Sequence, residues 1–455
     1  MTRQRHIAIV LLALDVVAAV VVFNLIRSLY ALGPTLLPLW MPISFLAFAI
    51  YLIQGYRART DMLSVDYASQ HTIAVLGAWL ATLLMVYAFV RSEGQLQMSR
   101  SVHFFGFLAL IPITLSYRRV LYLRMLKTRG TRSIVFLGDQ ASCEMFRDEC
   151  QKMGTVQPVI FTVVSEDSVP PFPSDSVGPL RPFHQVLDDV QAGRILVEAI
   201  VLRETARELV PSISRQLVQL YFWGVPTYTL ELFHQIYWQK IPLYRLNQTW
   251  LFQEGFQIAR EPVFERLKRS SDIALSLLGL ILAAPIIAIA GLAVWLGDRG
   301  PVFFAQTRIG KNHVPFRVFK LRTMRVAPAG AGDVYTQKGD SRITPIGRFL
   351  RASRIDEFPQ MWNVLRGDMS LIGPRAEWDR LVENYEREIP CYHFRHLVKP
   401  GITGWAQVNY PYGASVEDTL RKLEYDLYYI RHFSFVLDAT IVLKTIHIML
   451  FGKGR

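Results

Sequence analysis

The long uncharged stretches of this chain constrain its fold more than any other feature. Four apolar runs open the sequence, and each approaches the roughly 20 residues that a helix needs to cross a bilayer. They cover residues 7–26, 36–53, 73–90 and 102–117. The first run lacks a small-residue cleavage site, so a removed signal peptide is not expected. Charged residues make up only 19% of the chain, which is typical of a membrane protein.

Basic residues beside these runs predict their orientation. Arg3 and Arg5 precede the first run, and six basic residues follow the fourth: Arg118, Arg119, Arg124, Lys127, Arg129 and Arg132. Because basic residues concentrate on the cytoplasmic side, both ends of this unit should face the cytoplasm. We therefore expect four transmembrane helices within residues 1–125.

Residues 126–245 have the pattern of a parallel α/β module. Short apolar runs at 134–137, 159–164, 195–202 and 225–230 alternate with stretches that favour helix. The first run ends in Gly138-Asp139-Gln140-Ala141, which lacks the second glycine of a G-x-G-x-x-G fingerprint. We therefore interpret the module as Rossmann-like in fold, with a structural or regulatory role rather than dinucleotide binding.

A fifth apolar stretch, residues 273–296, has Pro285 near its middle. A simple crossing would carry the following segment, with 13 basic and five acidic residues between 301 and 375, to the outside. That outcome violates the positive-inside tendency, and the proline favours a kink. We predict a re-entrant helix at 273–297 that enters and leaves through one leaflet, with an ordinary kinked span as the alternative. The apolar segment 435–451 should lie along the membrane surface or pack on the domain.

An acidic pair, Asp356 and Glu357, marks the candidate chemical site. Apolar residues recur every three or four positions from 355 to 365, so the pair should begin a short amphipathic helix that Gly367 ends. At the positive end of a helix dipole, the two carboxylates should be ionised and face outward. They suit a nucleophile or a magnesium ligand that acts on a phosphate.

Basic residues surround this pair in the sequence. Arg348, Arg351 and Arg354 lead to it, and a predicted strand at 316–321 should present Lys320 at its surface. Arginine forks grip phosphate oxygens, and the net charge of +13 calls for an anionic partner. Nucleic acid fits poorly, because the cluster lies between membrane-embedded segments. A loop at 328–332 is rich in glycine, alanine and proline and is suited to a lid.

The three cysteines are too few for a disulfide framework and indicate a reduced, cytosol-facing location. Cys391 lies near His393 and His396 in the sequence, a pattern that can bind metal. We interpret this loose group as structural, because it has no second half.

Several motifs together resemble the bacterial sugar transferases, the polyprenyl-phosphate hexose-1-phosphate transferases that start polysaccharide assembly. The matching segments are Gly300-Pro-Val-Phe-Phe304 with Gln306 and Arg308, Lys320-Leu-Arg-Thr-Met324, Asp356-Glu-Phe-Pro-Gln360, Asn363-Val-Leu-Arg-Gly-Asp-Met-Ser370, Gly373-Pro-Arg375, and Lys399-Pro-Gly-Ile-Thr-Gly-Trp-Ala-Gln-Val408. The N-terminal helices and the α/β module resemble the long-form members. The resemblance implies an α-rich catalytic domain at 262–455, on a re-entrant helix, with Mg²⁺ as cofactor.

The resemblance also implies residue roles. Asp356 corresponds to the nucleophile and Glu357 to the magnesium ligand, while Lys320, Arg351 and Arg375 correspond to phosphate and nucleotide contacts. Arg322 and Glu377 are further substrate-binding candidates within matching motifs. The family's Pro-Arg-Pro-Glu reads Pro374-Arg-Ala-Glu377 here, and its Ser-Pro at the helix break reads Ala284-Pro285, so the proline alone must set the bend.

The implied reaction moves a sugar-1-phosphate from a UDP-sugar to undecaprenyl phosphate and releases UMP. Such an enzyme would be a multi-pass protein of the bacterial inner membrane, in contact with its lipids, with the catalytic domain on the cytoplasmic face. The alternatives are a membrane glycosyltransferase that releases UDP and a non-catalytic scaffold of an export complex. The sequence leaves the sugar open, with glucose modestly favoured, and also leaves open a homodimer.

Overall fold

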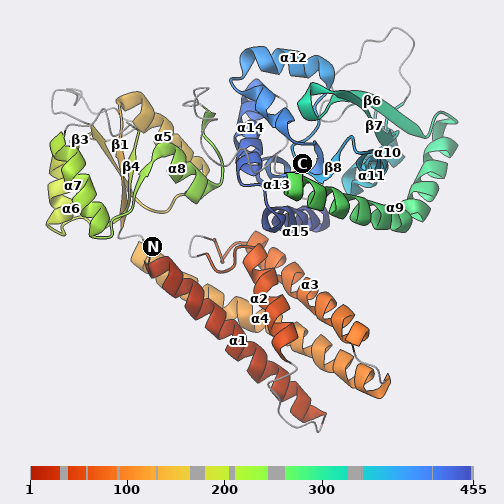
Figure 1. Ribbon diagram of the computed structural model, residues 1–455, viewed down its shortest axis with the longest axis horizontal. Coiled ribbons are helices and arrows are strands. Elements are labelled where there is room, and N and C mark those ends of the chain that lie inside the picture. The colour runs from red at the N-terminus through yellow and green to blue at the C-terminus, as the bar shows by residue number, and fades with distance from the viewer. Residues whose placement is uncertain are drawn as a thin grey trace. The chain divides into compact units, whose positions relative to one another are not determined.

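The computed structural model is mostly helical and divides into two units, residues 1–239 and 240–455, each described here by itself (Figure 1). It describes residues 2–30, 39–57, 60–89, 93–129, 132–163, 180–203, 211–243, 262–325, 340, 342–411, 413 and 415–451.

The first unit begins with the predicted apolar helices. They are α1 (Thr2–Leu29), α2 (Trp40–Leu52), α3 (Val65–Phe89) and α4 (Glu93–Arg129). Among the described residues of this unit, α1, α3 and α4 are long and apolar enough to cross a membrane, and α9 (Pro262–Asp298) of the second unit is as well. The second predicted span differs, because α2 has 13 residues and covers only about 20 Å, and residues 31–38 before it lie outside the described part.

A buried ion pair joins the first and last of these helices. Arg118 of α4 donates to both carboxylate oxygens of Asp15 on α1, at 2.5 and 2.6 Å. Tyr56 donates to the same carboxylate at 2.6 Å, and Tyr117 also bonds to it. Because every charge in this cluster has a partner, polar groups can be accommodated inside an apolar bundle.

The α/β module has the predicted doubly wound form. Its elements are β1 (Ser133–Leu137), α5 (Gln140–Lys152), β2 (Val159–Val163), β3 (Arg181–Pro182), α6 (Phe183–Gln191), β4 (Val197–Leu202), α7 (Pro211–Phe222), β5 (Thr227–Thr229), α8 (Leu230–Phe233) and a π-helical turn, η3 (His234–Trp238). Within the described residues, five parallel strands lie in the order β3-β2-β1-β4-β5. Side chains on the two faces of β1 enter separate hydrophobic cores, one with Phe146 of α5 and one with Leu187 of α6. The sheet is therefore covered on both sides, as a parallel sheet requires.

The turn after β1 places an acidic side chain at the start of α5. Asp139 caps α5 by accepting a hydrogen bond from the Ser142 amide at 3.0 Å, and it also pairs with Arg203 at 2.5 Å. In nucleotide-binding relatives of this fold, the phosphates take that place at the helix N-terminus. Here the chain's own carboxylate occupies it.

The second unit contains a long helix and a compact domain. Its elements are α9 (Pro262–Asp298), β6 (Phe303–Ile309), a 3-10 turn η7 (Lys311–His313), β7 (Pro315–Leu321), α10 (Pro345–Ser353), η8 (Ile355–Glu357), α11 (Gln360–Arg366), β8 (Ser370–Ile372), α12 (Asp379–Glu388), η9 (Tyr392–Leu397), β9 (Gly401–Thr403), α13 (Trp405–Asn409), α14 (Val416–Arg431) and α15 (Phe435–Phe451). Trp405, Tyr429 and Ile441 lie in its largest core. The predicted α-rich domain is confirmed.

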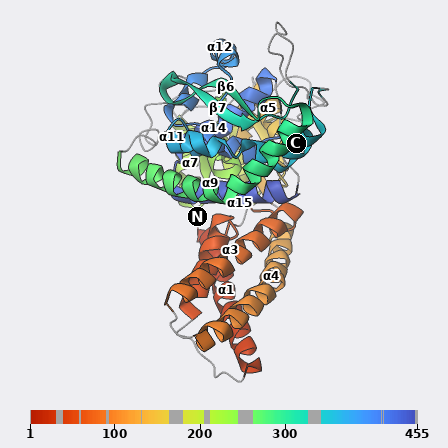
Figure 2. The same cartoon turned by 90° about the vertical axis from the view of Figure 1, so that its right-hand side faces the viewer.

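Helix α9 is bent, and both of its ends are attached to the same domain. Figures 1 and 2 show its two halves running in different directions, and Pro285 lies inside the helix. Near its start, Lys268 pairs with Asp438 of α15 at 2.5 Å, and at its end Asp298 accepts from Arg322 at 2.7 Å. A straight helix of 37 residues would separate its ends by about 55 Å. The bend allows both ends to contact one compact domain.

Helix α15 packs on the domain along one face. Asp438 accepts from Tyr429 at 2.8 Å, and Lys444 donates to Asn409 at 2.7 Å. On the other face Val442 and Leu450 are exposed. The packing alternative therefore holds for one side of this helix, and an apolar strip is left on the other.

Candidate active site

The strand that carries Lys320 is aligned by a buried asparagine. Asn363 of α11 is fully buried, accepts from the Phe319 amide at 3.0 Å and donates to the Arg317 carbonyl at 2.7 Å. These two bonds attach the helix to β7 on either side of Val318, just before Lys320. Because buried amide hydrogen bonds are costly to break, the strand cannot easily slide relative to the acidic pair.

The acidic pair lies in a 3-10 turn rather than in the predicted helix. Arg354 joins α10 to this turn in the left-handed conformation, with φ of 60°. Helix α11 begins only at Gln360, after Pro359, and ends at the predicted stop, where Gly367 has φ of 98°. The apolar periodicity of 355–365 therefore spans two short elements, η8 and α11, and the left-handed residue before them, Arg354, is not a glycine.

Glu357 is surrounded by three cations. Lys320 Nζ lies 2.9 Å from its Oε1, Arg375 lies 3.6 Å from the same oxygen, and Arg354 lies 3.7 Å from Oε2. Burial opposes ionisation of this carboxyl, but Lys320, Arg375 and Arg354 together hold its pKa well below the usual range. Glu357 is therefore an ionised residue that positions basic side chains.

Lys320 is less exposed than the sequence predicted. Its side chain is only 17% exposed and contacts Glu357. Burial lowers its pKa, and the neighbouring Arg375 and Arg308 add to this effect, while Glu357 and Asp356 oppose it. Its charge is thus directed into the site and not to the bulk solvent.

Asp356 differs sharply from its neighbour. Among the described residues its carboxylate has no hydrogen-bond or ion-pair partner, although the residue is only 7% exposed. Burial and the charge of Glu357 raise its pKa to about 6, while Lys320, Arg351 and Arg354 act in the opposite direction. The prediction that both carboxylates face outward is wrong, because the turn buries the pair. A pKa of about 6 still allows Asp356 to ionise at neutral pH.

The remaining predicted residues are placed in different ways. Arg351 donates from Nε to the Thr323 hydroxyl at 2.9 Å, and its charge acts on Asp356. Arg322 instead bonds to Asp298 and to the Pro301 carbonyl, at 2.7 and 2.6 Å, at the end of α9.

Glu377 lies 4.0 Å from Arg395. Its backbone carbonyl accepts from the Ile309 amide at 3.1 Å and so attaches to the hairpin. Arg322 and Glu377 thus contact residues around the acidic pair rather than the pair. Lys320, Arg351 and Arg375 contact the pair or act on it through their charge.

Two further basic residues belong to this group. Arg354 contacts Glu357, and Arg308 of β6 bonds to the Ala376 carbonyl and to Gln306 at 2.9 Å. Both lie in segments that the sequence analysis singled out, but only the backbone turn at Arg354 and the pairing of β6 with β7 bring them here. The predicted lid at 328–332 lies outside the described residues.

The carboxylate oxygens of the acidic pair suit a magnesium ion that is bound to a diphosphate. Asp356 and Glu357 offer hard carboxylate oxygens, and Mg²⁺ commonly takes one or two carboxylates together with substrate phosphates and water. The three cations around Glu357 would offset the negative charge that such a ligand adds. Glu357 is the candidate metal ligand.

An apolar groove lies beside the acidic turn. It has a volume of about 480 Å³ and is formed by α9 and α10 together with Ile355, the residue before Asp356. Ile286 and Ile289 line one wall, and Phe349 and Leu350 line the other. A hydrocarbon chain in this groove would end near the carboxylates.

Comparison with known proteins identifies this second unit. Residues 263–452 match the family model described as bacterial sugar transferase. An N-acetylgalactosaminephosphotransferase of Aeromonas hydrophila, named for UDP-N-acetylgalactosamine and undecaprenyl phosphate, is 37% identical over 59% of this chain and 63% of its own length. The UDP-glucose:undecaprenyl-phosphate glucose-1-phosphate transferase of Escherichia coli K12 is 44% identical over 40% of this chain and 39% of its own.

The chain spans less than two thirds of the length of these two relatives. It covers a shorter relative almost completely: the exopolysaccharide production protein PSS of Rhizobium leguminosarum is 40% identical over 93% of its length. That match and the family model together show the family, and the residues that the model matches include the motifs around Asp356. The chain belongs to the bacterial sugar transferase family.

Proposed function

We propose that this protein transfers a sugar-1-phosphate from a UDP-sugar to undecaprenyl phosphate, the first step in assembly of a polysaccharide. The observation that carries the proposal is the contrast within the acidic pair. Glu357 is held by Lys320, Arg375 and Arg354, whereas Asp356 beside it has no partner among the described residues. One carboxylate therefore organises positive charge, and the other is available as a nucleophile.

The reaction proceeds in two displacements at one phosphorus atom. In the first, an Asp356 oxygen attacks the phosphorus that carries the sugar, the bond to the bridging oxygen breaks, and UMP leaves with the electron pair. In the second, an oxygen of undecaprenyl phosphate attacks the same phosphorus and displaces the Asp356 carboxylate. The product is undecaprenyl-diphosphate-sugar, and the enzyme returns to its starting form.

The basic residues supply what such a displacement needs most, which is position and neutralised charge. Lys320 and Arg375 already lie beside Glu357, so they are aimed at the place where a diphosphate would meet Asp356. Arg351 acts on Asp356 from α10. A Mg²⁺ ion held by Glu357 would add further neutralisation of phosphate charge.

The membrane attachment of the site suits a lipid acceptor. Helix α9 is fastened to the domain at both ends and exposes a row of large apolar side chains, among them Leu278, Leu282 and Ile289. We infer that α9 enters and leaves the cytoplasmic leaflet of the inner membrane. The apolar groove beside Ile355 then receives the first isoprene units of the acceptor, with its phosphate next to Asp356.

The names of relatives suggest which donor sugars to test first. The names of the two relatives compared above include glucose and N-acetylgalactosamine. We propose glucose as the first substrate to test, with galactose and the acetamido sugars beside it.

Replacement of Asp356 by asparagine should reduce UMP release by at least about 10³-fold, because the amide cannot form the acyl phosphate. Glu357→Gln should leave weaker activity that needs more Mg²⁺. Purified protein in nanodiscs, with UDP-sugars and undecaprenyl phosphate, provides the assay, and the exposed Glu383→Gln on α12 is the matched control. Release of UDP instead of UMP, or an active Asp356→Asn variant, would rule out the proposed chemistry.

The same Asp356→Asn variant should be more stable than the wild type at pH 8. The folded pKa of about 6 is above the value of about 3.9 expected for the unfolded chain, so ionisation opposes folding. The destabilisation is absent well below pH 4, grows as the pH rises from about 4 to 6, and levels off above pH 6 at no more than about 3 kcal/mol. Thermal unfolding of both proteins at pH 4.5 and 8 measures it, with Glu383→Gln as control. A stability difference that does not depend on pH would contradict the assigned pKa.

Single cysteines test the path of α9. We expect cysteines at Ser270 and Arg299, both exposed near its two ends, to react with a membrane-impermeant maleimide from the cytoplasmic side only. A cysteine at Ser28, exposed at the end of α1, should react from the opposite side. The background carries alanine at Cys143, Cys150 and Cys391. Labelling of positions 270 and 299 from opposite sides would show that α9 crosses the membrane.

A further inference from the structure

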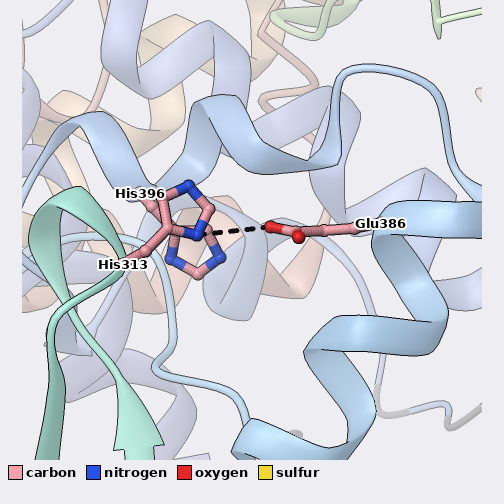
Figure 3. Close-up of side chains that lie close together, drawn as sticks. All are labelled: His313, Glu386 and His396. Carbon is pink, nitrogen blue, oxygen red and sulfur yellow. Dashed lines mark ion pairs between the residues drawn. The ribbon is translucent and has the colours of Figure 1, made fainter.

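Three potential metal ligands from distant segments meet on the catalytic unit, apart from the acidic pair. They are His313 in the turn between β6 and β7, Glu386 on α12 and His396 in η9 (Figure 3). One ring nitrogen of each histidine and one carboxylate oxygen all lie within 4.8 Å of one another. His313 Nδ1 and Glu386 Oε1 are 3.3 Å apart.

His396 forms the buried base of this group. It is 6% exposed, and its Nε2 has no hydrogen-bond partner in the described part of the chain. The ring makes a hydrogen bond with the backbone of Gly310, which leaves Nε2 as the nitrogen available to a ligand. Buried ring nitrogens normally have partners. Histidines that bind metals commonly use one nitrogen for the ion and donate the other to a backbone carbonyl.

The turn that presents His313 holds two consecutive non-glycine residues in a strained backbone conformation. Asn312 and His313 have φ of 54° and 61°, and the Val314 amide donates to the Lys311 carbonyl at 3.2 Å. This is a type I′ turn, in which glycine is strongly favoured at the position that His313 occupies. Backbone strain at a residue with a chemically active side chain is a frequent mark of function.

We propose that His313, Glu386 and His396 bind a divalent transition-metal ion, with Zn²⁺ the best fit, which fastens the β6–β7 hairpin to α12 and η9. Two imidazoles and one carboxylate are a common zinc ligand set. Ligand atoms about 2.0–2.1 Å from a tetrahedral ion lie about 3.3 Å apart, as His313 and Glu386 do already. Their side chains are 48% and 34% exposed, so the ion can enter from solvent and keep water as its fourth ligand.

This site differs from the metal group considered in the sequence. Of Cys391, His393 and His396, only the last belongs to it, because His393 is exposed and packs against Phe394. The other two ligands come from segments that only the fold brings near. The site uses different residues from the proposed Mg²⁺ ligand Glu357, and it does not depend on the proposed reaction.

The test uses full-length protein purified without a histidine tag, stripped with EDTA and then supplied with Zn²⁺. We expect about one bound Zn²⁺ per chain by elemental analysis and a rise of about 5 °C in Tm. The critical variant is His313→Gly, because glycine suits the left-handed turn and should leave the metal-free Tm unchanged or higher. It should lose both the bound Zn²⁺ and the rise in Tm.

His393→Ala and Glu388→Gln are matched controls, since both residues are exposed close to the site in sequence, and both variants should respond as the wild type does. A wild type without a zinc-dependent rise in Tm would overturn the proposal. The same conclusion would follow if His313→Gly kept its zinc and its response, because the ion would then be bound elsewhere. Neither readout depends on catalytic activity, so failure of the proposed reaction would leave this test unaffected.

Discussion

The ion pair between Lys320 and Glu357 is the interaction on which the candidate site depends. It joins the end of a β-hairpin to a 3-10 turn, across 2.9 Å, in surroundings that disfavour both charges. Arg354 and Arg375 also contact the carboxylate of Glu357. The buried Asn363 on α11 aligns strand β7. A buried ion pair is rarely retained for stability alone, because removal from water costs as much as the attraction returns. Its benefit here is that Glu357 pairs with the cations, while Asp356 has no partner in the part of the chain that the structure describes.

The same domain is attached to its long apolar helix at two points. Lys268 with Asp438 and Asp298 with Arg322 fix the two ends of α9 to one folded body. This arrangement gives Arg322 a clear structural purpose, which is to anchor the helix end. It also places an apolar groove between α9 and α10 beside the acidic turn. The acidic turn thus adjoins an apolar surface, which is the arrangement that the proposed lipid acceptor needs.

Much of the architecture could be predicted because it follows from local patterns. Apolar length predicted the long helices, and alternating apolar runs predicted the parallel sheet. Tertiary contacts decided what remained. Burial of Asp356, which raises its pKa to about 6, comes from neighbours distant in sequence, so a helix-dipole argument gave the wrong environment.

The same reason explains which contacts and backbone conformations were hard to foresee. Arg354 adopts a left-handed conformation that arginine seldom takes, and nothing in the neighbouring sequence predicts it. The pairing of Arg322 with Asp298 joins residues 24 positions apart. His313, Glu386 and His396 come together only through the fold, which is why the sequence suggested a different and less suitable group around Cys391.

The central claim is that Asp356 becomes covalently attached to the phospho-sugar. The most direct measurement is mass spectrometry of the protein mixed rapidly with UDP-sugar and Mg²⁺ in the absence of lipid acceptor. The account predicts a mass increase equal to one sugar phosphate, located on the peptide that contains Asp356, together with up to one equivalent of UMP. The adduct should disappear when undecaprenyl phosphate is added. Lipid product formed with normal UMP release, but without any adduct at Asp356, would contradict the account.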